Sequence, residues 1–105
     1  MVSRDRISAL KAADVPPGTC RRAYVSGKEI AVFNVGGEFY ATQAQCTHAG
    51  GPLPDGSLAG EIVTCPWHGS QFDVRTGEVV HDPATQPLTT YPVEVKDGVL
   101  VVGQS

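Results

Sequence analysis

Two short segments, each with one cysteine and one histidine, constrain this chain more than any of its other features. The first is Cys46-Thr47-His48 and the second is Cys65-Pro66-Trp67-His68. Each segment is short enough to lie on one loop. Together the two loops offer two thiolates and two imidazoles, a ligand set that suits zinc and also iron. The two loops can therefore serve one inorganic centre if the chain folds so that they meet.

The remaining composition fits a small protein built around a cofactor. The chain has 105 residues, of which 41% are hydrophobic and 18% are charged, so we expect one domain over residues 1–105 with a modest core. Its three cysteines are an odd number, which favours metal ligation over a framework of disulfides.

Charge and hydropathy argue against several classes of function. The net charge of −3 disfavours a nucleic-acid binder, which would need a basic surface, and favours protein partners with basic docking faces. No apolar run approaches the roughly 20 residues of a membrane span. The amino terminus leads into no hydrophobic secretion signal. We therefore expect a cytoplasmic protein that binds neither nucleic acid nor membrane.

Turn residues between short apolar segments predict an antiparallel all-β protein. Gly36-Gly37 and Lys96-Asp97-Gly98 each indicate a hairpin. No segment has sustained helical periodicity. The expected strands cover residues 20–25, 30–35, 38–42, 62–65, 71–74, 79–80, 91–95 and 99–102. They suggest a β framework with a small ligand-bearing insert at roughly residues 43–80.

The way the ligands are divided between the loops bears on the choice of metal. Zinc modules commonly place two cysteines on one knuckle and two histidines on another, whereas each loop here has one of each. If both cysteines bind one metal and both histidines a second, each loop has to bridge a two-metal unit such as a [2Fe–2S] cluster. The spacing favours that cluster and leaves a structural zinc site open as the alternative.

The residues around these ligands closely resemble the two cluster-binding loops of Rieske [2Fe–2S] proteins. The similarity runs through residues 46–53 and 65–73, continues through Arg75-Thr76-Gly77, and reaches a proline-containing loop from Pro83 to Leu88 that covers the cluster in that family. In detail the chain is most similar to the stand-alone ferredoxins of bacterial ring-hydroxylating dioxygenase systems. The resemblance implies a Rieske-like antiparallel β-sandwich or barrel base with a small cluster-binding insert that carries two ligand loops.

The resemblance also implies one [2Fe–2S] cluster per chain. Cys46 and Cys65 would hold the inner iron, and His48 and His68 the outer iron. Two neutral imidazoles in place of two thiolates make such a cluster less negative, which raises its reduction potential into a family range of about −150 to +300 mV.

Neighbouring residues indicate the low part of that range. The high-potential respiratory members have an extra cysteine in each loop, and the disulfide between them braces the site; Gly51 and Trp67 occupy those positions here. A tyrosine that donates a hydrogen bond to sulfur in those members corresponds to Phe72, which has no hydroxyl. The Ser70 hydroxyl remains available for a sulfide. We predict a potential of about −150 to 0 mV.

The resemblance implies a one-electron carrier between a flavin-dependent ferredoxin reductase and a terminal, aromatic-ring-hydroxylating oxygenase. An enzyme is not expected, because a mononuclear oxygenase iron needs two histidines and a carboxylate. Only His81 remains once His48 and His68 bind the cluster. We expect a monomeric carrier, and the alternative is the small Rieske-like subunit of a nitrite reductase-type complex.

Three further residues have simple interpretations. Cys20 is predicted to be a small buried residue of a strand, and His81 an ordinary loop residue near the rim of the cluster. Trp67 either packs locally or forms an apolar docking rim with Pro52 and Leu53.

Overall fold

The protein is described by a computed structural model, which covers residues 6–25, 27–47, 50–67, 69–81 and 85–103. Within these ranges the regular structure is strand, apart from the short 3-10 helices η1 (Ala12–Asp14) and η2 (Leu53–Asp55). The strands are β1 (Arg6–Lys11), β2 (Cys20–Val25), β3 (Lys28–Val35), β4 (Glu38–Gln43), β5 (Ser57–Ala59), β6 (Ile62–Thr64), β7 (Gln71–Asp73), β8 (Val79–His81), β9 (Thr90–Tyr91), β10 (Val93–Lys96) and β11 (Val99–Val102). No helix of the described residues is long and apolar enough to cross a membrane.

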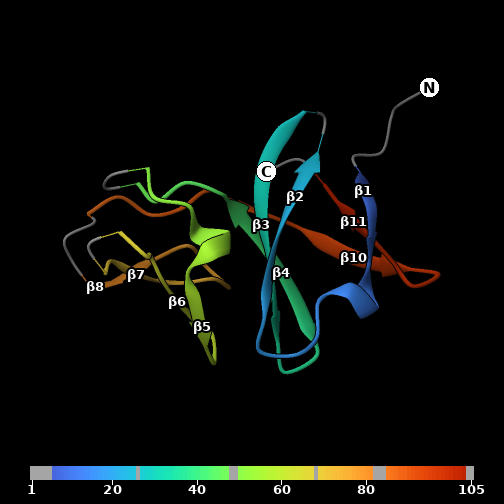
Figure 1. Cartoon of the computed structure of the whole chain (residues 1–105), viewed down its shortest axis with the longest axis horizontal. Helices are drawn as coiled ribbons and strands as arrows, with labels where there is room; N and C mark the ends of the chain where they lie inside the picture. The colour runs from blue at the N-terminus through green and yellow to red at the C-terminus, as the bar shows by residue number, and fades with distance from the viewer. Residues whose placement is uncertain (1–5, 26, 48–49, 68, 82–84, 104–105) are drawn as a thin grey trace.

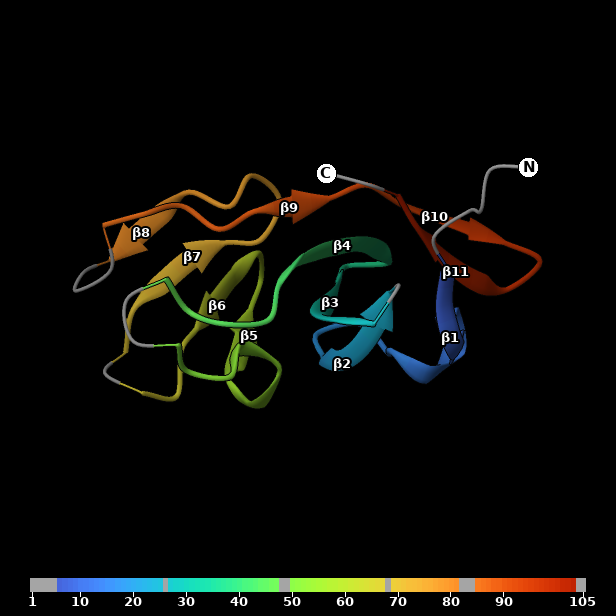
Figure 2. The ribbon, with the colours of Figure 1, turned by 90° about the horizontal axis from the view of Figure 1, so that it is seen from above.

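The strands form three antiparallel sheets, which confirms the predicted all-β class. Their orders are β1-β11-β10, β2-β3-β4-β9 and β5-β6-β7-β8. The sheet of β5–β8 forms one end of the elongated molecule, and the sheet with β10 and β11 forms the other (Figure 1). Seen from above, β9 leads back from the first end toward β10 (Figure 2). The base therefore comprises the first two sheets, and the third sheet projects from it.

The central strand β3 has both faces buried, because it lies between two separate cores. Successive side chains of a strand point to opposite faces. Ile30 and Val32 accordingly pack into the core of the base, whereas Ala31 and Phe33 pack into the core beneath the third sheet. This double burial explains the uninterrupted apolar run that predicted a strand here. It also joins the two ends of the molecule through one strand.

Both predicted hairpins are present, and their turns have the geometry that their residues favour. Gly36 and Gly37 connect β3 to β4 with φ values of 60° and 101°. Asp97 and Gly98 connect β10 to β11 with φ values of 53° and 77°. Two consecutive residues at positive φ match the twist of the flanking strands, which is why glycine and aspartate occur there.

Other element boundaries differ from the expectation. The strand expected over residues 91–95 is two strands in two sheets, because Pro92, which has no N–H to donate, lies between β9 and β10. The strands β1 and β5 were not predicted.

The segment between β4 and β9, which we call the insert (residues 44–89), is longer than the expected 43–80. Its two ends meet at Gln43, whose N–H donates to the Thr89 carbonyl (2.9 Å) and whose side-chain Oε1 accepts from the Thr89 N–H (2.8 Å). These two hydrogen bonds hold the start and the end of the insert together where it joins the base.

Candidate metal centre

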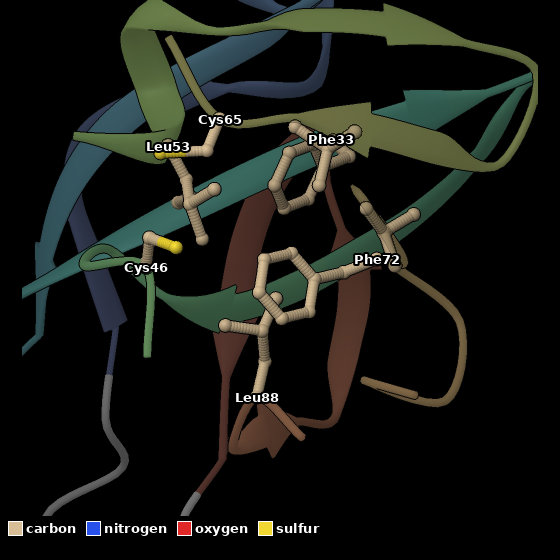
Figure 3. Close-up of a cluster of buried hydrophobic side chains, with 9 residues drawn as sticks. Phe33, Cys46, Leu53, Cys65, Phe72 and Leu88 are labelled. Atoms are coloured by element: carbon tan, nitrogen blue, oxygen red, sulfur yellow. The ribbon is translucent and has the colours of Figure 1, made fainter. Parts of the chain in front are cut away.

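The two cysteines of the predicted ligand set lie in the same buried cluster of side chains. Cys46 is 3% exposed and Cys65 is 2% exposed. Figure 3 shows both side chains at one edge of this cluster, with the Leu53 side chain between them. Phe33 and Phe72 complete the core beside them. The fold therefore brings together two thiols that are far apart in the sequence, in surroundings that exclude water.

The first ligand loop begins at Cys46, shortly after β4. The Cys46 N–H donates to the Gly51 carbonyl, and the Gly50 N–H donates to the Cys46 carbonyl, both at 2.8 Å. Gly50 has a φ of 75°, in the left-handed region that glycine adopts without strain. The loop is thus closed on itself by its own backbone, which fixes the position of Cys46.

The second ligand loop repeats this arrangement. Cys65 directly follows β6, and its N–H donates to the carbonyl of Ser70 at 2.8 Å. Ser70 is fully buried. In each loop, then, the cysteine N–H closes the loop on the carbonyl of the residue five positions later. The two loops are similar devices that present one thiol each to the same buried space.

The environment of Cys65 suits a thiolate bound to metal. The Trp67 backbone N–H lies 3.4 Å from the Cys65 Sγ and donates to it. Burial raises the pKa of the Cys65 thiol, the Trp67 N–H lowers this pKa, and hydrogen bonding with Cys46 raises it. A bound cation would offset the cost of burying two thiolates. Two adjacent buried sulfurs and an N–H donor therefore fit iron, and they also fit zinc.

A third loop is attached to the first ligand loop by a side chain. The Thr47 hydroxyl donates to the carbonyl of Gln86 at 2.7 Å. Two residues on, Leu88 is buried in the core that contains both cysteines. The loop that was expected to cover the cluster is therefore held against the first ligand loop at Gln86, whereas Pro83 itself lies outside the described residues. Nothing in the sequence indicated this contact, because its two partners are separated by 39 positions.

The two histidine ligands of the prediction, His48 and His68, lie outside the described residues, so their role stays a prediction. Within the described residues, no group of three histidine, cysteine or acidic side chains could hold a metal ion. His81 was expected in a loop, but it ends the strand β8 and is exposed there. It pairs in register with Gln71, so that strand pairing determines its position.

One expectation about another side chain is wrong, and so is part of one alternative. Cys20 was expected to be buried, but it is only partly so, and its Sγ lies 3.4 Å from the Pro54 carbonyl. Leu53 was considered for an exposed docking rim, but it is fully buried because it packs beside the two cysteines. Trp67, by contrast, is 50% exposed and remains available to a partner.

The low reduction potential was predicted from Phe72, Gly51 and Trp67, and the positions of these residues agree with that prediction. Phe72 is fully buried in the core with the cysteines and carries no hydroxyl. A Cβ placed on Gly51 would lie 3.1 Å from the Trp67 Cβ, so the two positions compared with the respiratory disulfide do face each other. Among the described residues, which include all three cysteines, there is no disulfide.

Charge is distributed unevenly over the molecule. The insert contains five of the eleven acidic residues but only one of the eight basic residues, Arg75. Arg75 pairs with Asp73 at 2.9 Å and with Glu61 at 3.6 Å. Residues 44–54 and 65–72, which form the ligand loops, include no charged side chain. The two ligand loops are therefore uncharged, and the sheet behind them is acidic.

Comparisons with known proteins agree with the resemblance seen in the sequence. The Rieske [2Fe-2S] domain family matches residues 5–92. A protein named "Ferredoxin CarAc" from Metapseudomonas resinovorans is 45% identical over 95 residues, covering 89% of each chain.

Two solved structures have the same fold. The "Sphingomonas yanoikuyae B1 ferredoxin" is 36% identical with a TM-score of 0.89, over 98% of this chain and 100% of that one. The second structure is titled a complex of reduced oxygenase and oxidized ferredoxin in carbazole 1,9a-dioxygenase. It is 40% identical with a TM-score of 0.84, over 96% of this chain and 91% of that one.

Proposed function

This chain belongs to the Rieske [2Fe-2S] domain family, and we propose that it is the ferredoxin of an aromatic-ring-hydroxylating oxygenase system. It carries electrons one at a time and is not itself a catalyst. The observation that carries this proposal is the match, over nearly the whole of both chains, to a protein named as a ferredoxin. When bound, the [2Fe–2S] cluster accepts one electron and gives it up again.

Four residues would hold the cluster. Cys46 and Cys65 are proposed as the ligands of the inner iron, and His48 and His68 as the ligands of the outer iron. The burial of both thiols in one core supports the first pair. The second pair is supported by the sequence, since each loop supplies one histidine close to its cysteine. We further propose that residues 1–105 form a single Rieske domain, with the ligand loops in its insert.

The described residues around the thiols have three tasks in this function. The apolar core that contains Leu53 and Phe72 excludes water from the sulfur side of the site. The Trp67 N–H donates to a ligand sulfur and so stabilises its negative charge. Thr47 keeps the third loop against the first. These contacts keep the surroundings of the centre constant, so that little rearrangement accompanies each change of charge.

The partners follow from the same role. We propose that a flavin-dependent ferredoxin reductase supplies the electron and a terminal oxygenase receives it. A structure of a similar ferredoxin is titled as its complex with an oxygenase, which supports the second partner. The uncharged ligand loops with the exposed Trp67 are the surface that we propose for docking. A small, weak interface there would allow rapid exchange by a monomeric carrier in the cytoplasm.

Two alternatives from the sequence are disfavoured. A structural zinc site remained open on ligand spacing, but membership of a [2Fe-2S] domain family favours iron and sulfide. A small subunit of a nitrite reductase-type complex is disfavoured because the reported relatives are ferredoxins, one of them from a dioxygenase system.

Electron transfer in both directions tests the proposal. The purified protein is mixed without oxygen with NADH and a flavin-dependent ferredoxin reductase of a ring-hydroxylating system, and its visible absorption is followed. We expect the absorption to bleach on reduction and to return when oxidised terminal oxygenase is added. A Cys65→Ser variant, which lacks one proposed ligand, is the control and should show neither change. Protein without iron and acid-labile sulfide, or protein that no such reductase bleaches, would contradict the proposal.

A further inference from the structure

Gly51 and Trp67 belong to different ligand loops and pack directly against each other. A Cβ built on Gly51 would lie 3.1 Å from both the Cβ and the Cγ of Trp67, and 2.6 Å from the Cys65 Sγ. The backbone of Gly51 is not among those with positive φ. Glycine is therefore required here by the closeness of its neighbours and not by its own conformation.

Trp67 connects the two loops through two different parts of one residue. Its backbone N–H donates to the Cys65 Sγ at 3.4 Å, within the second loop. The near end of its side chain lies against Gly51 of the first loop. Half of the residue is nevertheless exposed, so the contact covers only one side of it. The Trp67 Cβ, which lies against Gly51, is bonded to the Cα that also carries the N–H directed at the sulfur, so a displacement of this Cβ would shift that N–H.

We propose that Trp67 is a positioning residue: its contact with Gly51 fastens the second ligand loop to the first and holds the Trp67 N–H on the Cys65 sulfur. This inference rests on the proposed function, since it assumes that Cys65 is a cluster ligand. Hydrogen bonds to the ligand sulfurs help to set the potential of an iron–sulfur cluster. A donor that stabilises the thiolate favours the more negative, reduced state, so the contact raises the potential. It also slows the opening of the loops that releases the cluster.

A role in docking alone would also explain an exposed tryptophan, and the two roles are distinguishable. If Trp67 only contacts a partner, its replacement changes electron transfer between proteins but not the midpoint potential or the rate of cluster release of the isolated protein. If Trp67 positions the loops, its replacement changes the isolated protein. The experiment therefore uses the cluster-loaded protein without partners.

Trp67→Ala is compared with the wild type and with Trp67→Phe, which keeps an aromatic ring at this position. We expect Trp67→Ala to have a lower midpoint potential in protein-film voltammetry. It should lose its cluster to a chelator about tenfold faster, the lower end of the effect typical of residues that support metal ligands. Trp67→Phe should stay close to the wild type in both measurements. A Trp67→Ala variant that matches the wild type in both would overturn the inference.

Fluorescence provides a second measurement, which applies even if Trp67→Ala assembles no cluster. Trp67 is the sole tryptophan of the chain, so emission excited at wavelengths that the three tyrosines do not absorb reports on this side chain. In Gly51→Ala the new methyl group would lie too close to the Cys65 Sγ (2.6 Å) and to the base of the Trp67 side chain (3.1 Å), so the two loops should separate there. Acrylamide should then quench the emission more strongly than in the wild type. Gly60→Ala, at a glycine with nothing within 4 Å of an added Cβ, is the matched control and should leave the quenching unchanged.

Equal quenching in the wild type and in Gly51→Ala would overturn the inference. Failure of the proposed function has a different signature, because wild-type protein would then contain no iron and no acid-labile sulfide. Suppose instead that the wild type contains iron and acid-labile sulfide, and that the variants have the same midpoint potential, rate of cluster release and quenching as the wild type. This result would contradict the positioning role of Trp67 and leave the proposed function intact.

Discussion

At the scale of single residues, the three cysteines have different surroundings and should have different roles. Cys46 and Cys65 are buried side by side in the core of the insert. Cys20 lies on β2 with its Sγ directed at the Pro54 carbonyl. Burial, followed by the nearby charge of Asp55, raises the pKa of the Cys20 thiol. Cys20 is therefore an unreactive thiol that packs against η2, and it is not expected to bind the cluster.

Substitution of each cysteine tests this division. Cys46→Ser and Cys65→Ser should reduce the iron and acid-labile sulfide per chain to near zero, because each removes a proposed ligand of the same iron. Cys20→Ala should keep the full content of both. Chemical analysis of the purified proteins gives the result. Normal cluster content in either serine variant, or its loss in Cys20→Ala, would show that the ligands have been assigned wrongly.

A second residue-scale prediction concerns Asp73, which ends β7. Hydrogen bonds from the Arg75 guanidinium, at 2.9 and 3.1 Å, are the main reason why the pKa of Asp73 is lowered. A carboxylate with a lowered pKa in the folded state stabilises the fold above its unfolded-state pKa, which is about 3.9. This contribution is lost as the pH falls through the lower pKa of the folded state.

Asp73→Asn should therefore lower the midpoint of thermal unfolding at neutral pH and have a diminishing effect in acid. The difference between the two proteins should be constant above about pH 5 and shrink below the unfolded-state pKa of about 3.9. Calorimetry over a series of pH values measures it. A difference that stays the same down to the lowest pH would show that the charge of Asp73 is not involved.

At the scale of elements, the turn after β7 determines how the third loop returns to the base. Gly77 has a φ of 83°, and a Cβ placed on it would lie 2.3 Å from the Leu88 carbonyl oxygen. The Leu88 N–H donates to the Gly77 carbonyl at 2.7 Å. This close approach anchors the segment that leads Leu88 into the core with the cysteines.

Gly77→Ala should destabilise the fold more than Gly60→Ala does. Both changes place a side chain at positive φ, which costs about 1–2 kcal/mol. Only Gly77→Ala adds a backbone clash, and we expect a further cost of about 1–3 kcal/mol from overpacking. Chemical denaturation of the two variants gives the comparison. Equal free energies of unfolding would mean that Leu88 moves aside without cost.

The elements also show what the sequence could and could not predict. The β3–β4 and β10–β11 hairpins were predicted because their turn residues act locally. The strand β1 was missed because it contains few large apolar residues and is formed by pairing with β11, at the other end of the chain. The two thiols were predicted to meet, and they do. The contacts of Thr47 with Gln86 and of Gly51 with Trp67 could not be predicted, because they depend on how separate loops pack.

At the scale of the whole molecule, we expect the acidic insert and its uncharged ligand loops to influence how the proposed partners approach. The negative charges on the sheet behind the ligand loops would attract a partner with a basic surface from a distance. The uncharged loops can then approach closely without having to desolvate charged groups. This arrangement favours fast association and fast release over a tight complex.

The rate of reduction by a flavin-dependent reductase, the proposed electron donor, should therefore depend on salt. We expect the second-order rate constant to fall by about tenfold or more between low and high ionic strength, as steered associations do. Glu78→Gln, at an exposed acid of the insert, should reduce this dependence more than Glu94→Gln, at an exposed acid of the base. Stopped-flow measurements over a range of salt concentrations test both statements. A rate that salt does not change would rule out steering by the insert.

The most direct test of the whole account is pulsed electron paramagnetic resonance of the chemically reduced protein, because it detects the nitrogen atoms bound to a paramagnetic iron centre. The account predicts a [2Fe–2S] signal with couplings from two imidazole nitrogens, one of which disappears in His48→Cys and in His68→Cys if these variants assemble a cluster. A reduced iron–sulfur signal without imidazole nitrogen couplings, or no signal from a protein that contains zinc, would contradict it.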